Sequence, residues 1–161
     1  MISRFGVMFF TNPLAAFQNI HRSMAVGGQV NLLSWKSFDE NLWMKIPAMA
    51  AFEILEKPNP PDKGEPGPFS LADEGLVKDL LANAGFDSVG LSEIKVDLNL
   101  GQLDEATHLM TQLGPAGRPF LEASKNNQEI ALDLIRQALS KFDSGQNVVL
   151  PAACWLIQAT A

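Results

Sequence analysis

The sequence contains little of what metal, redox and nucleic-acid sites are made from. Cys154 is the only cysteine among 161 residues, so an internal disulfide and a cysteine-based zinc site are both excluded. The two histidines, His21 and His108, are far apart and lack the spacing of a zinc-binding helix. Eighteen acidic residues outnumber twelve basic ones, and no block of lysine or arginine provides the basic stripe that nucleic acids require. We therefore expect no metal centre and no nucleic-acid partner.

Long apolar runs are also missing. No segment reaches the ~18 consecutive apolar residues of a membrane span, and the apolar residues 1–10 lack the cleavage site of a secretory signal. We expect a cytoplasmic protein that makes no contact with a membrane. Its 161 residues, 47% of them hydrophobic and 19% charged, suffice for the core of a single domain spanning 1–161.

Several residues mark where helices are expected to begin and end. Asn12-Pro13 is a typical helix start, and Gly27-Gly28 is expected to stop that helix. Ser70 is expected to cap a later helix that ends at Gly85. Five prolines and two glycines predict an irregular loop at 57–68. Further helical segments are expected to open at Ser37 or Asp39 and to run over 104–113 and 129–142.

Three segments have the pattern of strands. Residues 29–35 (QVNLLSW) carry no charge, and residues 93–100 alternate apolar and polar side chains, as an edge or one-sided strand does. Residues 148–157 are apolar on both faces, which is typical of a strand inside a sheet. Strands and helices together predict an α/β fold with a small sheet and packed helices.

The order of several motifs resembles one family. Residues 3–10 (SRFGVMFF), then Asn12-Pro13 and a helix, then Gly27-Gly28 and a strand, resemble the class I SAM-dependent methyltransferases. Residues 67–73 (GPFSLAD) and 150–156 (LPAACWL) extend the resemblance over nearly the whole chain. It is closest to the small-molecule branch that includes ubiquinone/menaquinone C-methylase-like enzymes. One departure is Val26, where the family usually has proline.

The resemblance implies a partial Rossmann-like sheet. In the family order 3-2-1-4-5-7-6, this chain would supply strands 5, 7 and 6 and the end of strand 4, with its last strand antiparallel and central. The family's glycine-rich SAM loop lies in an N-terminal half, and no GxGxG occurs in this sequence. The chain thus resembles a C-terminal half. SAM is the cofactor implied for the parent family, but we expect none bound to this chain alone.

The resemblance also implies where a small-molecule acceptor would bind. The expected substrate-binding residues lie at the ends of the fourth and fifth strands and in the helices that follow: Ser3, Arg4, Phe5, Phe9, Trp35 and Trp43. The alternative for Arg4 is a solvated terminal residue, and for the aromatic residues it is packing in the core. No catalytic residue is assigned, and Cys154 is interpreted as a buried apolar residue.

Two functions remain open from the sequence. The first is a portion of a SAM-dependent methyltransferase, inactive as the isolated chain, which would pair with a missing N-terminal half. The second is a non-catalytic module that forms oligomers or binds a small ligand. The uncharged strand 29–35 is expected to be an exposed sheet edge, which predicts a symmetric homodimer through 1–10 and 29–35.

Overall fold

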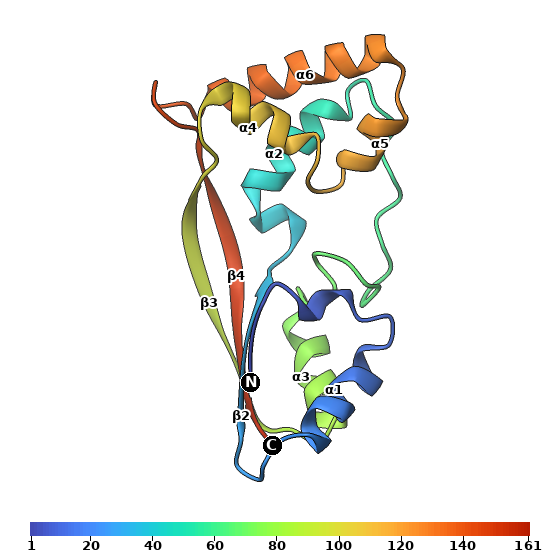
Figure 1. Ribbon diagram of the computed structural model, residues 1–161, viewed down its shortest axis with the longest axis vertical. Coiled ribbons are helices and arrows are strands. Elements are labelled where there is room, and N and C mark those ends of the chain that lie inside the picture. The colour runs from blue at the N-terminus through green and yellow to red at the C-terminus, as the bar shows by residue number, and fades with distance from the viewer. The chain divides into compact units, whose positions relative to one another are not determined.

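The four strands of the chain form one sheet in the order β1-β2-β4-β3 (Figure 1). The computed structural model describes all residues from 1 to 161. The strands are β1 (Ile2–Arg4), β2 (Gln29–Trp35), β3 (Asp87–Asn99) and β4 (Val149–Thr160). The helices are α1 (Pro13–Arg22), α2 (Leu42–Ala51), α3 (Glu74–Asn83), α4 (Leu103–Met110), α5 (Gly117–Glu122) and α6 (Lys125–Ser140). Two 3-10 turns, η1 (Val7–Phe9) and η2 (Phe38–Glu40), precede α1 and α2.

The chain divides into two compact units. Unit 1 comprises Met1–Ser37, Pro61–Lys95 and Ala153–Ala161, and unit 2 comprises Phe38–Pro60 and Val96–Ala152. That all 161 residues behave as one domain stays a prediction. None of the helices is both long enough and apolar enough to cross a bilayer.

The sheet of unit 1 confirms the expected strand arrangement. β1 runs parallel to β2, with Ser3 opposite Leu32, and β2 runs antiparallel to β4, with Leu32 opposite Ile157. β4 is therefore central and β3 is an edge strand, as their hydrophobic patterns predicted. β3 begins at Asp87, six residues earlier than expected.

The expectation that β2 is the exposed edge is wrong, because β1 covers part of it. Ile2, Ser3 and Arg4 pair with residues 31–33, and the Asn31 N–H donates to the Met1 carbonyl at 2.9 Å. The open edge in this region is β1. Leu32, in the middle of β2, is only 1% exposed and belongs to the core.

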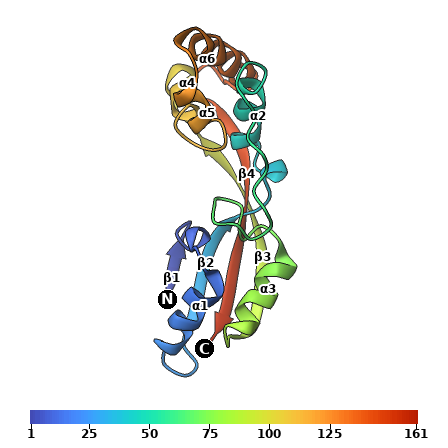
Figure 2. The ribbon, with the colours of Figure 1, turned by 90° about the vertical axis from the view of Figure 1, so that its right-hand side faces the viewer.

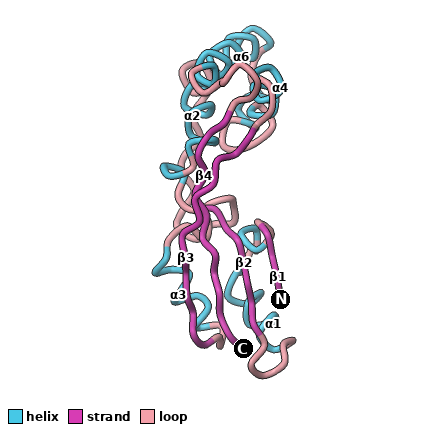
Figure 3. Tube along the Cα trace, turned by 90° about the vertical axis from the view of Figure 1, so that its left-hand side faces the viewer, coloured by secondary structure: helices cyan, strands magenta, loops and turns pink.

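Helices α1 and α3 both lie on the same face of the unit 1 strands. They lie in front of the strands in Figure 2 and behind them in Figure 3, and they contact each other. The Asn12 side chain caps α1 as expected, accepting from the Ala15 N–H at 3.0 Å. The expected Ser70 cap of α3 is wrong, because Asp73 accepts from the Leu76 N–H at 2.9 Å. The Ser70 hydroxyl instead donates to the Met8 carbonyl at 2.7 Å.

The core of unit 1 lies between these helices and the sheet. It contains Phe17 from α1, Leu32 from β2, Leu81 from α3 and Ile157 from β4, each no more than 1% exposed. Gly85 ends the α3 segment with a φ of 101°, the left-handed conformation expected of a glycine stop. Helix–sheet packing with large side chains therefore holds the strands in place.

Unit 2 is mostly helical. α2 and α4 both pack against α6. Ala51, Ala106 and Ala131 lie in these three helices and are 0% exposed. Helix α5 has no counterpart among the expected elements, and α6 begins four residues earlier than its expected start at 129. Small side chains at the helix contacts allow close approach of the helix axes.

Candidate functional site at the ends of β1 and β2

Three of the predicted site residues follow one another at the end of β1. Ser3 and Arg4 end the strand and Phe5 follows it, while Trp35 is the last residue of β2. Because β1 and β2 are parallel, their carboxyl ends lie at the same edge of the sheet, where open α/β sheets bind ligands. The structure therefore brings Ser3, Arg4, Phe5 and Trp35 to one place.

Phe5 and Trp35 form a stacked aromatic pair. Their ring centroids are 4.0 Å apart and their planes differ by 12°. The Phe5 N–H donates to the Leu33 carbonyl at 2.9 Å, which extends the β1–β2 pairing by one residue. Phe5 has a φ of 57°, which a bulky non-glycine residue adopts only when its surroundings enforce it. The hydrogen bond and the stack supply that enforcement.

The surroundings of Ser3, Arg4 and Phe9 differ from one another. Ser3 is half-buried and Arg4 is exposed. Phe9 is 55% exposed in η1, so the alternative of core packing is wrong for this residue. The neighbouring Phe10 does pack inward, edge-on to Phe17 at 5.8 Å between ring centroids. Arg4 and Phe9 are thus the site residues open to solvent.

Trp43 belongs to unit 2. It lies in α2, is 7% exposed, and its indole Nε1 donates to the Asn41 Oδ1 at 3.3 Å. This burial fits the core-packing alternative for Trp43. The structure therefore unites four of the six predicted residues at the strand ends in unit 1, with Phe9 following in η1, and places the sixth in the helical unit.

Sequence reasoning missed a charged group beside this site. Lys36 directly follows β2, and its Nζ lies 2.7 Å from the Glu93 Oε1 and 4.4 Å from the centre of the Trp155 ring. The Trp155 Nε1 donates to the Ala72 carbonyl at 2.8 Å. Hydrogen bonding from Lys36 lowers the pKa of the Glu93 carboxyl. A lysine directly after a buried strand is the sequence signal that could have identified this group.

The site has no groups for metal or thiol chemistry. No group of three or more histidine, cysteine, aspartate or glutamate residues could hold a metal ion. Cys154 is 2% exposed, and its burial raises the pKa of the thiol to about 11, so it stays protonated at neutral pH. The interpretation of Cys154 as a buried apolar residue is confirmed. What remains is the half-buried Phe5–Trp35 pair, which packs against the core of unit 1 as the core-packing alternative predicts, and the exposed Arg4 next to Phe5 in the chain.

Known proteins resemble this chain in structure but not detectably in sequence. No family model matches it, and neither does any curated protein. A candidate methyltransferase from Bacillus halodurans C-125 superposes with a TM-score of 0.51, covering 99% of this chain and 67% of its own, at 14% identity. The fold is methyltransferase-like.

A second solved structure gives a weaker superposition. It is phosphoethanolamine N-methyltransferase 2 from Haemonchus contortus, in complex with phosphomonomethylethanolamine and S-adenosylhomocysteine. The TM-score is 0.41 at 13% identity, covering 99% of this chain and 32% of the other. This chain thus spans about two thirds of the first protein and one third of the second. At these identities, the likeness to the first establishes the fold alone.

The methyltransferase-like fold of this chain does not include residues suited to hold SAM. Nucleoside cofactors on such sheets are approached by a glycine-rich turn that joins a strand to a helix. The only adjacent glycines, Gly27 and Gly28, follow α1 and lead into β2, so they lie at the wrong kind of junction. The turn after β1 contains the bulky Phe5 and Phe9 around Gly6. These residues do not fit the cofactor.

Proposed function

We propose that this chain is a portion of a SAM-dependent methyltransferase that acts on a small-molecule acceptor, related to the ubiquinone/menaquinone C-methylase-like branch. The observation that carries the proposal is the strand order β1-β2-β4-β3, with parallel β1 and β2 and an antiparallel β4 beside β2. This arrangement corresponds to strands 4, 5, 7 and 6 of the family. The superposition covers 99% of the chain, which supports the same assignment.

Within this proposal, the chain contributes the acceptor side of the site. The half-buried Phe5–Trp35 stack would form an apolar wall at the strand ends, and the exposed Arg4, adjacent to Phe5 in the chain, would provide a positive charge. Such groups orient an acceptor and exclude water from it, which is a large part of the catalysis of group transfer. No residue of this chain is assigned a proton transfer.

Titration calorimetry with SAM tests the cofactor half of the proposal. Purified residues 1–161 should show no saturable binding of SAM, because no glycine-rich turn approaches the cofactor. A micromolar dissociation constant for the isolated chain would overturn this expectation. The same sample should show no methyl transfer.

The size of the native polypeptide tests whether this chain is a portion of a longer methyltransferase. An antibody against the exposed surface of α6 can isolate the native protein for intact-mass measurement. We expect a polypeptide longer than 161 residues, with a glycine-rich segment before the residue numbered Met1 here, and we expect it to bind SAM. A native mass of 17.5 kDa would contradict the proposal and favour a module that functions without methyl transfer.

One observation favours such a module as a second candidate. β1 has only three residues and one open side, and its Ile2 side chain is 85% exposed. Because the Met1 carbonyl accepts from β2 and the Phe5 N–H donates to it, alternation along the strand directs the backbone groups of Ile2 and Arg4 outward. An unpaired strand of this kind can pair with its copy across a two-fold axis. In this second candidate function, the chain is a homodimer through β1.

Light scattering on the chain and on Ile2→Pro tests the dimer. Proline removes the outward N–H of residue 2 and leaves the bonds from Met1 and Phe5 to β2 in place. We expect a dimer for the parent chain and a monomer for the variant. A stable monomer of 17.5 kDa for the parent chain would overturn the second candidate, the homodimer through β1.

A further inference from the structure

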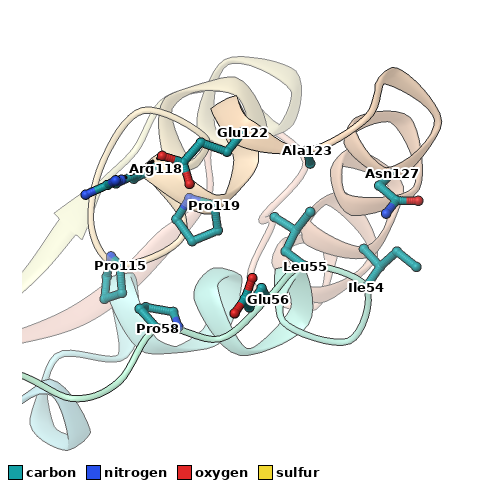
Figure 4. A pocket seen from close by; sticks show the side chains of 10 residues that line it. All are labelled: Ile54, Leu55, Glu56, Pro58, Pro115, Arg118, Pro119, Glu122, Ala123 and Asn127. Carbon is teal, nitrogen blue, oxygen red and sulfur yellow. Dashed lines mark hydrogen bonds and ion pairs between the residues drawn. The ribbon is translucent and has the colours of Figure 1, made fainter.

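A cavity in unit 2 has no part in the proposals above. It lies between the segment that follows α2, the turn leading into α5, and the start of α6 (Figure 4). Its volume is about 600 Å³, which lies within the range of small-molecule sites, roughly 300–1,000 Å³. All of its lining residues belong to the same compact unit. The cavity is thus of a size to bind a small organic molecule.

Its walls mix apolar and polar side chains, and three of the lining residues have no backbone N–H. Ile54 and Leu55 line one side, and Pro58, Pro115 and Pro119 line another (Figure 4). Proline has a carbonyl but no N–H, so three wall positions can accept hydrogen bonds but cannot donate them. An anionic ligand needs donors. These walls instead favour a ligand with an apolar body and donor groups of its own.

The charged residues of the lining point to the same kind of ligand. Glu56, Arg118 and Glu122 give the lining a net charge of −1. The Arg118 Nε is 2.7 Å from the Glu122 Oε1, one helical turn away, so the only cation of the lining has an acidic partner within the lining. Figure 4 shows the Arg118 side chain extending away from Glu56 and Leu55. Glu56 is exposed to solvent, has no ion-pair partner, and accounts for the net negative charge of the lining.

We propose that this cavity binds a small organic cation, an amine or ammonium compound with an apolar body, whose charged group pairs with Glu56. The proposal is independent of the methyltransferase assignment, because the ligand does not have to be a methyl acceptor. An ammonium group donates up to three hydrogen bonds and so complements a carboxylate and proline carbonyls. The carboxylate of Glu56 repels an anion, and an uncharged ligand gains no charge-assisted hydrogen bond from it.

Amide NMR on the full chain tests this with three probes of equal length: hexylammonium, hexanol and hexanoate. We expect hexylammonium to shift amides within 54–58 and 115–127 saturably, and to bind about tenfold more tightly than hexanol, as a charged hydrogen bond implies. Its affinity should fall as salt is added, because exposed charge pairs are screened. Hexanoate should bind more weakly than hexanol.

Two variants and one matched control test whether Glu56 is the carboxylate that pairs with the ammonium group. Glu56→Gln should abolish the preference for hexylammonium over hexanol and leave hexanol binding unchanged. Glu122→Gln releases Arg118, so it should weaken hexylammonium and strengthen hexanoate. Glu53→Gln, an exposed acid outside the lining, should change neither. The spectra themselves report whether each variant is folded.

The outcomes against the proposal are equally definite. Equal affinity for hexylammonium and hexanol, tighter binding of hexanoate, or an undiminished amine preference in folded Glu56→Gln would each overturn it. So would saturable shifts confined to residues outside 54–58 and 115–127, or no saturable shifts at all.

Discussion

Buried alanines are more frequent in unit 2 than in unit 1, although both units also bury large side chains. In unit 1 the core between sheet and helices contains large residues such as Phe17, Leu32 and Phe86. In unit 2 the helices meet through alanines, of which Ala51 and Ala131 are completely buried. A sheet and a helix layer lie about 10 Å apart and need large side chains to fill the space, whereas helix pairs can approach through small ones. The buried alanine positions of unit 2 should therefore be sensitive to enlargement, and the large core residues of unit 1 to truncation.

The largest effect is expected when a large side chain is removed from unit 1. Phe17→Ala should lower the free energy of unfolding by about 3–5 kcal/mol, because Phe17 is 1% exposed and its loss leaves a cavity. Phe9→Ala is the matched control, since Phe9 is 55% exposed and should change stability by about 0.5 kcal/mol or less. Urea unfolding measures both. Similar losses for the two variants would contradict the assigned core.

The opposite substitution should be damaging in unit 2. Ala131→Leu adds three carbons at a completely buried position of α6 and should cost about 1–3 kcal/mol through overpacking. Gln137→Leu, at an exposed position of the same helix, is the control and should have little effect. If Ala131→Leu were as stable as the parent chain, the close contact of α6 with its neighbours would be refuted.

Local chemistry explains which elements could be predicted from the sequence. Asn12 and Gly85 act on residues within one turn of themselves, so the start of α1 and the stop after α3 were predicted correctly. Ser70 has the same capping chemistry, but it hydrogen-bonds to Met8, 62 residues away. Its role depends on tertiary structure, and the true cap, Asp73, was missed.

The buried face of α6 was predicted only in part. The sequence pattern favours Ile130, Leu134, Ala138, Leu139 and Phe142 as the inner stripe, and Leu139 is indeed buried. Ile130, however, is 39% exposed, and the other two buried residues are Ala131 and Ile135. Hydrophobicity alone favours isoleucine over alanine for burial. Close packing between helices favours alanine, and a single sequence does not reveal where helices touch.

The candidate site was also predicted only in part. The resemblance placed Ser3, Arg4, Phe5 and Trp35 at the strand ends, and the structure brings them together. The unusual backbone of Phe5 was not predictable, because nothing local favours a φ of 57° for phenylalanine. The pairing of β1 with β2 was also underestimated, since three residues give a weak strand signal.

The strain at Phe5 can be separated from its stack. Phe5→Gly and Phe5→Ala both remove the ring, but glycine accepts a positive φ and alanine does not, so the glycine variant should be about 1 kcal/mol more stable. At Asp79, in the middle of α3 in the same unit, the order should reverse, with Asp79→Gly about 1 kcal/mol less stable than Asp79→Ala. Urea unfolding of the four variants measures both differences. The same order at both positions would argue against the left-handed conformation of Phe5.

The smallest expected effect concerns the charge at the start of α3. Asp73 lies 2.7 Å from the Lys63 Nζ, and hydrogen bonding from Lys63 and from the Leu76 N–H lowers the pKa of its carboxyl. A carboxyl whose folded pKa is lowered stabilises the protein above its unfolded pKa of about 3.9, and this contribution is lost as the pH falls through the folded pKa.

Asp73→Asn keeps an oxygen that can cap Leu76 but removes the charge. We therefore expect Asp73→Asn to be less stable than the parent chain at pH 7, and the difference to shrink as the pH falls below about 4. The effect should be small, because Lys63 is 81% exposed and exposed ion pairs contribute little. Asp79→Asn, an exposed acid with no ion pair on the same helix, is the control and should show no such trend. A stability difference for Asp73→Asn that did not change between pH 7 and pH 2 would show that the charge of Asp73 does not contribute.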